Sequence, residues 1–251
     1  MKKTTKKAAK KVATKKVVPK PTIDKLLERS AERNKHKVRG SAYWKKRKLN
    51  DKERDWGLSK DTQGKDWVAD YSLSESHPHR EKILQLLTEF QWTHLLEVGC
   101  NAGANLLRIR EAFPDKALFG MDINPHAIAF AKETQRLSNV EIREGDIRET
   151  LPFQDGFHVI LADAVLMYIT PDEIDDVMDR LAQNASRAML IVDRYSEKGG
   201  VVGGVWGRDY RTLLERRGYT VAEVDMSESD WGSSKNWVKH GKYFLGLKWS
   251  A

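Results

Sequence analysis

The stretch HLLEVGCNAGAN, residues 94–105, runs from an apolar segment through a glycine-containing turn into a segment with helical spacing. A strand, a tight glycine turn and a helix form the unit that places ligands in doubly wound α/β folds. We expect Gly99 to permit close approach of a ligand to the backbone, and Gly103 to let the helix start tightly against the strand. The N–H groups at the helix start would then face a polar ligand. A glycine turn alone also suits an ordinary tight connection, so the rest of the chain must decide.

Strand and helix candidates alternate on both sides of this turn. The strand candidates are residues 93–98, 117–121, 140–143, 157–162, 188–193, 219–224 and 242–248, and the helix candidates are residues 78–90, 104–113, 125–137, 171–183 and 208–217. Pro125 and Pro171 stand where the first turn of a helix accepts proline. The alternation predicts an α/β domain over residues 75–251, with a doubly wound, mostly parallel, seven-stranded sheet covered by helices on both faces.

Four consecutive strand candidates end in an acid or are followed by one, namely Glu97, Asp122, Asp146 and Asp163. Ligands of doubly wound sheets bind at the carboxyl ends of the strands. Asp122 lies 23 residues beyond Gly99, near the offset of about 20 residues expected for an acid that accepts hydrogen bonds from ribose hydroxyls. It could instead cap the next helix, although Asn124 is better placed for that. The four acids together predict a site for a nucleoside-bearing ligand.

The turn and the acids resemble the motifs of the class I, Rossmann-like S-adenosylmethionine-dependent methyltransferases over about residues 75–249. The first motif of that family is an acid followed by three glycines at alternate positions. Glu97, Gly99 and Gly103 match it, and Asn101 replaces the middle glycine. Asparagine tolerates left-handed backbone angles better than most residues. The resemblance implies S-adenosyl-L-methionine as the cofactor and methylation as the activity.

The resemblance also implies a role for each motif. The glycine loop would lie against the methionine part of the cofactor, Asp122 would hold the ribose, and Ile123 would contact the adenine. Asp146 would accept from the adenine amino group, with Ile147 as its apolar neighbour. Residues 163–169 would lie beside the sulfonium and the acceptor, and the last two strands would form the reversed hairpin of the family.

A segment before the first core helix, Trp67–Arg80, corresponds to one that covers the cofactor in similar enzymes. Arg80 would pair with the methionine carboxylate, since a guanidinium matches carboxylate geometry. The alternative is a surface arginine at a helix start. Two further segments, residues 193–206 with four glycines and residues 227–237 with two tryptophans, would form either an acceptor-side lid or loops with packing tryptophans.

Methyl transfer from a sulfonium needs mainly positioning and electrostatics, and a general base if the acceptor is a hydroxyl. The candidate bases are His77, His79, Asp163, Tyr168 and Asp193. We expect Asp163, Tyr168 and His77 to be the catalytic residues, although a lone histidine is more often a surface residue. The single cysteine and the scattered histidines form no recognisable zinc site, so we expect no metal.

The basic charge of the chain belongs to its first sixty residues. Residues 1–20 carry nine lysines and no acid, residues 21–60 carry thirteen basic and six acidic side chains, and residues 61–251 carry 22 basic and 30 acidic ones. The Lys/Ala-rich composition of residues 1–21 predicts a disordered tail. This tail would either contact nucleic acid non-specifically or only solubilise the chain. Residues 22–74 predict a charged arm, in which the Tyr43–Trp44 pair would dock onto the core or stack on a base.

The predicted function is methyl transfer to an unidentified acceptor, a small molecule or another oxygen or nitrogen nucleophile. One alternative is a nucleic-acid-associated protein, although the acidic body offers no basic cleft and Asp163-Ala-Val-Leu replaces the N/D-P-P-Y/F tetrapeptide of amino-methylating DNA enzymes. The other is an NAD-dependent oxidoreductase, although the Gly99–Gly103 spacing departs from G-x-G-x-x-G. One cysteine, no long apolar run and no secretory signal lead us to expect a cytoplasmic protein without membrane contact.

Overall fold

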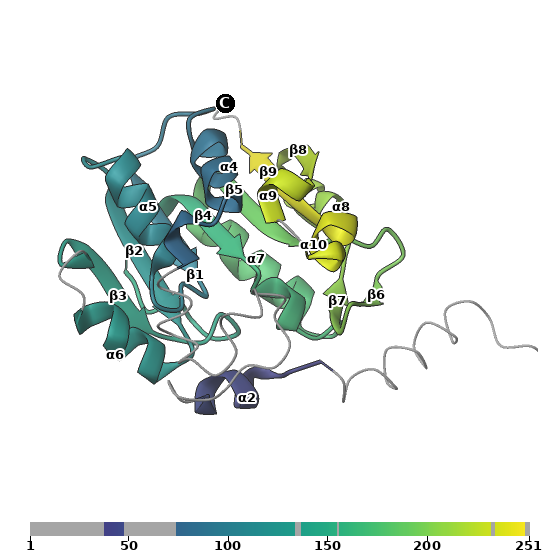
Figure 1. Cartoon of the computed structure of the whole chain (residues 1–251), viewed down its shortest axis with the longest axis horizontal. Helices are drawn as coiled ribbons and strands as arrows, with labels where there is room; N and C mark the ends of the chain where they lie inside the picture. Colours follow the sequence, from purple (N-terminus) through teal and green to yellow (C-terminus); the bar gives the residue numbers. More distant parts are fainter. Residues whose placement is uncertain (1–37, 48–73, 134–136, 155, 232–233, 249–251) are drawn as a thin grey trace, which may run out of the picture.

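A seven-stranded sheet forms the centre of the chain in the computed structural model, which describes residues 38–47, 74–133, 137–154, 156–231 and 234–248 (Figure 1). Its strands lie in the order β3-β2-β1-β4-β5-β9-β8. Their bounds are β1 His94–Val98, β2 Ala117–Asp122, β3 Val140–Glu144, β4 Phe157–Asp163, β5 Ala185–Arg194, β8 Thr220–Asp225 and β9 Gly241–Leu247. All neighbours pair in parallel except β9, which is antiparallel to both β5 and β8. The predicted doubly wound sheet and its reversed last strand are confirmed.

The strand order reverses beside β1, and this fixes the position of the site. The chain moves outward from β1 through β2 to β3, and then returns to place β4 on the other side of β1. Such a switch point opens a crevice at the carboxyl ends of the two central strands, because the connections that follow them diverge to opposite sides. The predicted motif around Glu97 and the segment after Asp163 therefore meet at this edge.

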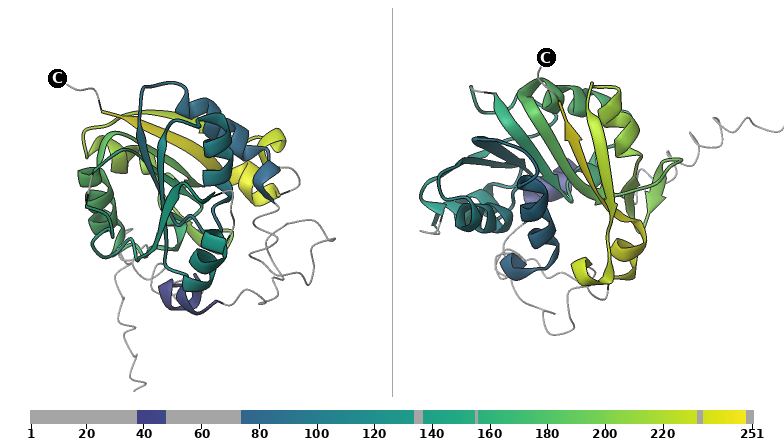
Figure 2. Two further views of the ribbon diagram at one scale, coloured as in Figure 1. Left: turned by 90° about the vertical axis from the view of Figure 1, so that its left-hand side faces the viewer. Right: turned by 90° about the horizontal axis from the view of Figure 1, so that it is seen from above.

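Helices cover both faces of the sheet, because successive strand side chains point to opposite sides (Figure 2). Leu95 packs into a core cluster with residues of α4 His79–Leu87, α5 Ala104–Ala112 and α6 Pro125–Glu133. Leu96 and Val98 pack into a second cluster with residues of α7 Ile174–Asn184 and α8 Tyr210–Glu215. The two apolar layers are fully buried and hold the strand tips in register.

Several predicted boundaries differ from the structure. Helix α7 begins at Ile174 and not at the predicted Pro171. Pro171 stands in a turn before the helix, and this turn is closed by hydrogen bonds from the Glu173 and Ile174 N–H groups to the Thr170 carbonyl. Pro125, in contrast, is the first residue of α6 as predicted. Strand β5 extends three residues before its predicted start, to Ala185.

The two segments predicted as loops contain regular structure. Residues 193–206 do not form a simple loop, since they include most of a small hairpin, β6 Gly200–Val202 paired with β7 Val205–Gly207. Residues 227–237 contain α9 Glu228–Trp231 and the start of α10 Lys235–His240. Sequence patterns of period 2 or 3.6 need more residues than these short elements offer.

Part of the predicted N-terminal region lies outside the described residues, including the tail 1–21, the segment 22–37 and both Trp67 and Tyr71. Residues 38–47 are described and contain the short helix α2 Ser41–Lys46, drawn in purple at the lower edge of Figure 1. A bilayer-spanning helix, one both long and apolar enough, is not found among the described helices.

Candidate active site

The turn between β1 and α5 places three alternate residues in the left-handed region. The φ angles are 71° at Gly99, 50° at Asn101 and 81° at Gly103. Asparagine tolerates this region because its short polar side chain can bond locally, which explains how Asn101 replaces the middle glycine of the motif. The turn is closed by a hydrogen bond of 2.8 Å from the Gly103 N–H to the Cys100 carbonyl.

The space beside both glycines is filled by protein, and this corrects the predicted reasons for them. A Cβ on Gly99 would lie 2.6 Å from Val165 Cγ2, so the glycine makes room for the segment after β4 and not for a ligand on that side. A Cβ on Gly103 would lie 2.6 Å from Leu137 Cδ1, so this glycine accommodates the segment after α6 and not a strand. The positive φ angles alone would also disfavour a side chain at both positions.

A buried amide joins the tips of β1 and β4. The Asn105 side chain, in the first turn of α5, donates through Nδ2 to Glu97 Oε1 at 2.7 Å and to Asp163 Oδ2 at 2.9 Å. All three residues are buried. Burial raises the pKa of the Glu97 carboxyl to about 8, against the opposing effect of the Asn105 hydrogen bond. Glu97 and Asp163, predicted to converge, are therefore brought together.

Two histidines extend this arrangement away from the glycine loop. His79 Nε2 lies 2.9 Å from Asp163 Oδ2, and His79 Nδ1 lies 2.6 Å from His77 Nδ1. His79 is buried at the start of α4, and His77 precedes it and is half-buried. Burial lowers the pKa of both imidazoles, to about 4 for His77, where the charges of His79 and Arg80 add to the effect. Both rings are therefore neutral at pH 7.

The hydrogen bonds fix the tautomers of these two rings. Burial raises the pKa of the Asp163 carboxyl, but its interaction and hydrogen bond with the His79 ring, together with Arg80 and the Asn105 hydrogen bond, outweigh burial, so the pKa is lowered and the group is ionised at pH 7. An ionised carboxylate only accepts, so we infer that His79 Nε2 carries its proton and His79 Nδ1 accepts from His77 Nδ1. His77 Nε2 is then left with a lone pair.

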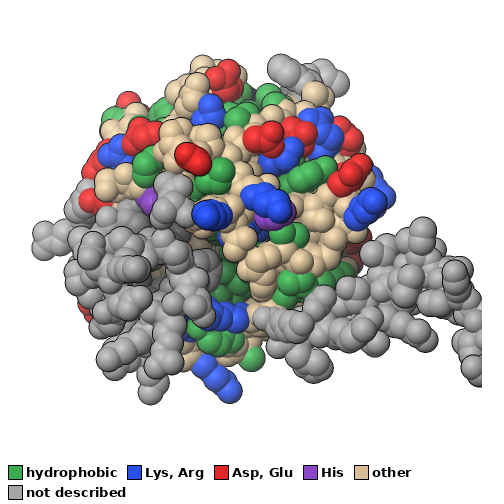
Figure 3. Space-filling model, turned by 45° about the vertical axis from the view of Figure 1, so that its right-hand side comes forward, with side chains coloured by type: hydrophobic (Ala, Val, Ile, Leu, Met, Phe, Trp, Pro, Cys, Tyr) green, Lys and Arg blue, Asp and Glu red, His purple; other side chains and the backbone are tan. Residues whose placement is uncertain are grey.

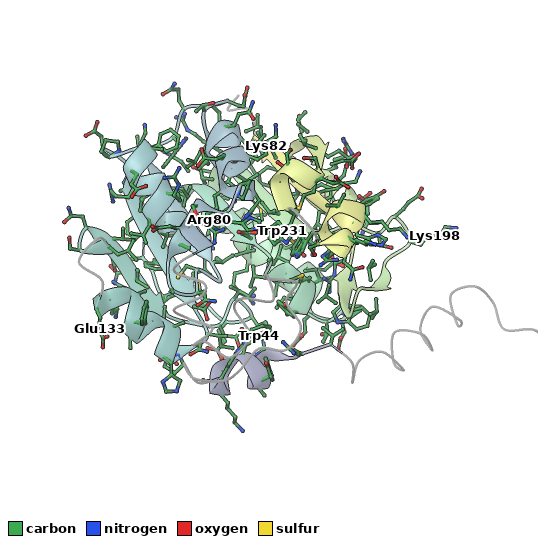
Figure 4. The ribbon with its side chains drawn as sticks, viewed as in Figure 1. Trp44, Arg80, Lys82, Glu133, Lys198 and Trp231 are labelled. Carbon is green, nitrogen blue, oxygen red and sulfur yellow. The ribbon has the colours of Figure 1, made fainter. Side chains whose placement is uncertain are left out.

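Arg80 lies beside the same ring, with Nη1 3.2 Å from His79 Nε2. It is 2% exposed, so the alternative of a surface arginine is wrong. Its positive charge lowers the pKa of both the Glu97 and the Asp163 carboxyls. Figure 4 shows Arg80 and Trp231 toward the middle of the molecule, where the His79 ring lies 4.4 Å from the Trp231 ring.

Asp122 closes the glycine loop from the tip of β2. Its Oδ2 accepts from the Asn101 N–H at 2.9 Å, and its Oδ1 accepts from the Asn124 N–H at 2.8 Å. Burial nevertheless raises the pKa of the Asp122 carboxyl to about 6. The Asn124 side chain caps α6 as predicted, accepting from the His126 and Ala127 N–H groups. Ile123, the predicted adenine contact, is half-buried beside them.

The fourth acid, Asp146, is paired with a neighbouring cation. Both carboxylate oxygens of Asp146 accept hydrogen bonds from the Arg148 guanidinium, which also reaches Glu173. Ile147 is 6% exposed and belongs to the core cluster that includes α7. A cation two residues along the chain thus pairs with Asp146 locally, and the predicted contact of Asp146 with the cofactor stays a prediction.

Helix α2 bridges the loops that follow β2 and β4. Asn124 Nδ2 donates to the Trp44 carbonyl at 3.0 Å and to the Arg47 carbonyl at 2.9 Å. The Trp44 ring lies 4.7 Å from the ring of Tyr168, in the short helix η4 Leu166–Tyr168. Docking of the Tyr43–Trp44 pair is therefore confirmed for Trp44, while Tyr43 remains exposed. Tyr168 thus lies between the arm and the tip of β4.

Sequence reasoning missed two contributors to this region. Asn105 was quoted only as the end of the motif, although a polar residue in the otherwise apolar first turn of a buried helix was a usable signal. Arg194, at the end of β5, was not considered, and its guanidinium lies 4.2 Å above the ring of Trp237. Trp237 stacks on Trp231 at 4.2 Å, so the two tryptophans do pack, as one of the two alternatives predicted.

Comparison with known proteins assigns the chain to a family. A family model described as a methyltransferase domain matches residues 90–202. A protein of Methanocaldococcus jannaschii, named as a protein N5-glutamine methyltransferase, is 33% identical over 138 residues, which are 50% of this chain and 68% of that protein. A trans-aconitate 2-methyltransferase of Klebsiella pneumoniae is 29% identical over 117 residues, 46% of this chain and 45% of the relative.

Solved structures share the fold at low sequence identity. The magnesium protoporphyrin IX methyltransferase of Synechocystis with bound S-adenosylmethionine has a TM-score of 0.55 at 11% identity, over 78% of this chain and 86% of that one. A TehB-like methyltransferase of Corynebacterium glutamicum has a TM-score of 0.54 at 14% identity, over 73% of this chain and 96% of that one. The chain belongs to the class I S-adenosylmethionine-dependent methyltransferases, as the family model, the M. jannaschii relative, the sheet order and the glycine turn together show.

Proposed function

We propose that the chain transfers the methyl group of S-adenosylmethionine to an oxygen or nitrogen nucleophile of a small-molecule acceptor that reaches His77. One observation carries this proposal, the hydrogen-bonded series from Glu97 through Asn105 and Asp163 to His79 and His77. The series joins the glycine loop, where the family motif lies, to an imidazole with a free lone pair. It therefore supplies both a place for the cofactor and a place for a departing proton.

Buried oxygens beside the glycine loop suit the amino-acid end of the cofactor. Four oxygens are buried and make no hydrogen bond within the described part of the chain. They are Glu97 Oε2, Asp163 Oδ1 and the amide oxygens of Asn101 and Asn105. Buried acceptors without partners are costly, and an ammonium group offers three donors. Glu97 and Asp163 would accept from that ammonium, and Arg80 would take the carboxylate.

The nucleoside would lie toward β2 and β3. Asp122 uses one lone pair of each oxygen on the loop N–H groups, so each oxygen has another for a ribose hydroxyl. Ile123 would pack on the adenine. Asp146 would accept from the adenine amino group with the lone pairs that Arg148 leaves free, beside Ile147. The half-buried positions of Asp122 and Ile123 support this placement.

The cofactor, when bound, supplies an electrophilic methyl group on a sulfonium, so the protein needs to orient the acceptor and remove its proton. His77 Nε2 would accept the proton of an acceptor hydroxyl or amine. The resulting imidazolium would be held by His79 Nδ1, while Asp163 keeps the His79 ring in the required tautomer. Tyr168, between Trp44 and the tip of β4, would orient the acceptor.

Replacement of Asp122 by alanine tests the cofactor site. We expect the Asp122→Ala variant to bind S-adenosylhomocysteine about tenfold to a hundredfold more weakly, because hydrogen bonds to a carboxylate are worth about 1.5–3 kcal/mol each. Calorimetry measures the affinity, and a screen of cell-extract fractions with methyl-labelled cofactor measures transfer. The exposed Asp115→Ala variant is the matched control. If wild type and Asp122→Ala bind S-adenosylhomocysteine with equal affinity, Asp122 does not hold the ribose.

Cofactor affinity should also depend on pH through Glu97. The ammonium of the ligand favours ionised Glu97, whose pKa in the free protein is about 8, so binding must release a proton below that pH. Affinity for S-adenosylhomocysteine should therefore rise with pH between about 6 and 8, by up to about tenfold per unit, and level off above. Asp122, with its pKa of about 6, adds to the dependence only at lower pH. The Glu97→Gln variant should bind weakly with a flat profile, and the same slope in both proteins would contradict this assignment.

The role of His77 predicts a split between binding and turnover. For an acceptor identified in the screen, the His77→Gln variant should lose about a hundredfold in kcat, the usual contribution of a general base. Its affinity for S-adenosylhomocysteine should stay within about twofold of wild type, because His77 lies beyond His79 from the glycine loop. The exposed His126→Gln variant is the control. An unchanged kcat in His77→Gln would show that His77 does not accept the proton.

A further inference from the structure

Arg194 is a buried cation without a counter-ion in the described part of the chain. The residue is 7% exposed, and its Nε and Nη1 are buried and make no hydrogen bond. No ion pair among the described residues includes it, although the charge of Asp193 acts on its pKa, and its Cζ lies 4.2 Å above the ring of Trp237. Burial lowers the pKa of this guanidinium. A buried, unpaired charge is costly and is rarely kept for stability alone.

Asp193, the neighbouring acid, serves the opposite face of the sheet. Successive residues of β5 alternate between faces, so Leu190 and Val192 pack with the cluster of Trp237, whereas Ile191 packs with that of Tyr210. Asp193 follows Ile191 by two positions, and its carboxylate accepts from the Met167 N–H at 3.0 Å and the Arg194 N–H at 2.7 Å. Its carboxylate therefore stabilises backbone groups, and no hydrogen bond or ion pair of the described residues joins it to the Arg194 guanidinium, although its charge opposes the effect of burial on the Arg194 pKa.

Arg208, another buried arginine, has the hydrogen-bond partners that a buried guanidinium usually has. Arg208 donates through Nη1 to the Leu166 carbonyl at 2.9 Å and through Nη2 to the Ile169 carbonyl. It thereby fixes the two ends of η4. Arg194 is equally buried, and its Nε and Nη1 have no such partners among the residues that the structure describes. The contrast indicates that the donors of Arg194 are kept for a group that is not part of the chain.

Arg194 lies on the acceptor side of the predicted site. Its Nη1 lies near the Gly203 turn between β6 and β7, where a Cβ would be 3.2 Å from both Nη1 and the Asn236 amide. Its partner ring, Trp237, stacks on Trp231, and Trp231 lies 4.7 Å from the His77 ring. Asp193 and Tyr168 both act on the Arg194 pKa, and they oppose the effect of burial. On the face shown in Figure 3, Lys and Arg side chains gather near the middle and carboxylates near the upper rim.

We propose that Arg194 binds a carboxylate of the methyl acceptor, which makes the substrate class a small carboxylic acid; this inference rests on the proposed function. A guanidinium matches a carboxylate with two parallel hydrogen bonds. The stacked rings of Trp237 and Trp231 would form an apolar wall between this anchor and His77, which suits an acceptor whose carboxylate and nucleophile are separated by an aromatic or unsaturated body.

The test uses the full chain saturated with S-adenosylhomocysteine, and benzoate, benzamide and inorganic phosphate as probes in calorimetric titrations. Wild type should bind benzoate at least about tenfold more tightly than benzamide, as expected for a charge-assisted pair. Arg194→Met should lose that preference, Arg194→Lys should retain part of it, and the exposed Arg216→Gln variant should behave as wild type. If inorganic phosphate binds as tightly as benzoate, the proposed carboxylate group of the acceptor is wrong and a phosphate group takes its place.

A second readout needs no acceptor. Because an unpaired buried charge destabilises the ligand-free protein, Arg194→Met should raise its melting temperature, whereas loss of a structural contact would lower it. A lower melting temperature, or equal binding of benzoate and benzamide by wild type, would overturn the inference. If one of these results is found but wild type still binds S-adenosylhomocysteine, only the role of Arg194 fails. If wild type does not bind it, the proposed function itself fails.

Discussion

The buried amide of Asn105 is the interaction on which the site depends. Two acids at the tips of neighbouring parallel strands would repel each other in a buried setting, and Asn105 Nδ2 donates to both at 2.7 and 2.9 Å. It is held by α5, whose start is set by the left-handed turn at Gly103. The turn therefore does more than admit a ligand, since it delivers the donor that allows Glu97 and Asp163 to lie together. In the described part of the chain Glu97 Oε2 and Asp163 Oδ1 make no hydrogen bond, and for this reason we propose that the pair accepts from the cofactor ammonium.

From this pair the site extends in two directions with different chemistry. Toward β2, Asp122 and the loop N–H groups form a polar rim suited to hydroxyl donors. Toward α4 and α9, two neutral histidines and two stacked tryptophans lead to Arg194. Helix α2 lies against the loops that follow β2 and β4, because Asn124 and Tyr168 contact it from these two loops. A methyl donor and its acceptor would thus approach from opposite sides of the Asp163 tip.

The sequence predicted those parts of the structure that follow from periodicity and from strand-tip chemistry. The seven strands, the reversed last strand, the turn at Asn101 and the pairing of Glu97 with Asp163 fall in this class, because each depends on residues close in the chain or on one sheet edge. Contacts between distant segments were not accessible. Val165 against Gly99 and Arg194 over Trp237 depend on loop paths that no local pattern encodes. The short elements α9, α10 and the β6–β7 hairpin were missed for lack of length.

A crystal structure with bound S-adenosylhomocysteine tests the central claim most directly, because it locates the donors that reach the two strand-tip acids. The account predicts that the ligand ammonium lies within hydrogen-bond distance of Glu97 Oε2 and Asp163 Oδ1, with Asn105 still donating to both carboxylates. A ligand bound elsewhere, or an Asn105 side chain turned away from either acid in the complex, would contradict it.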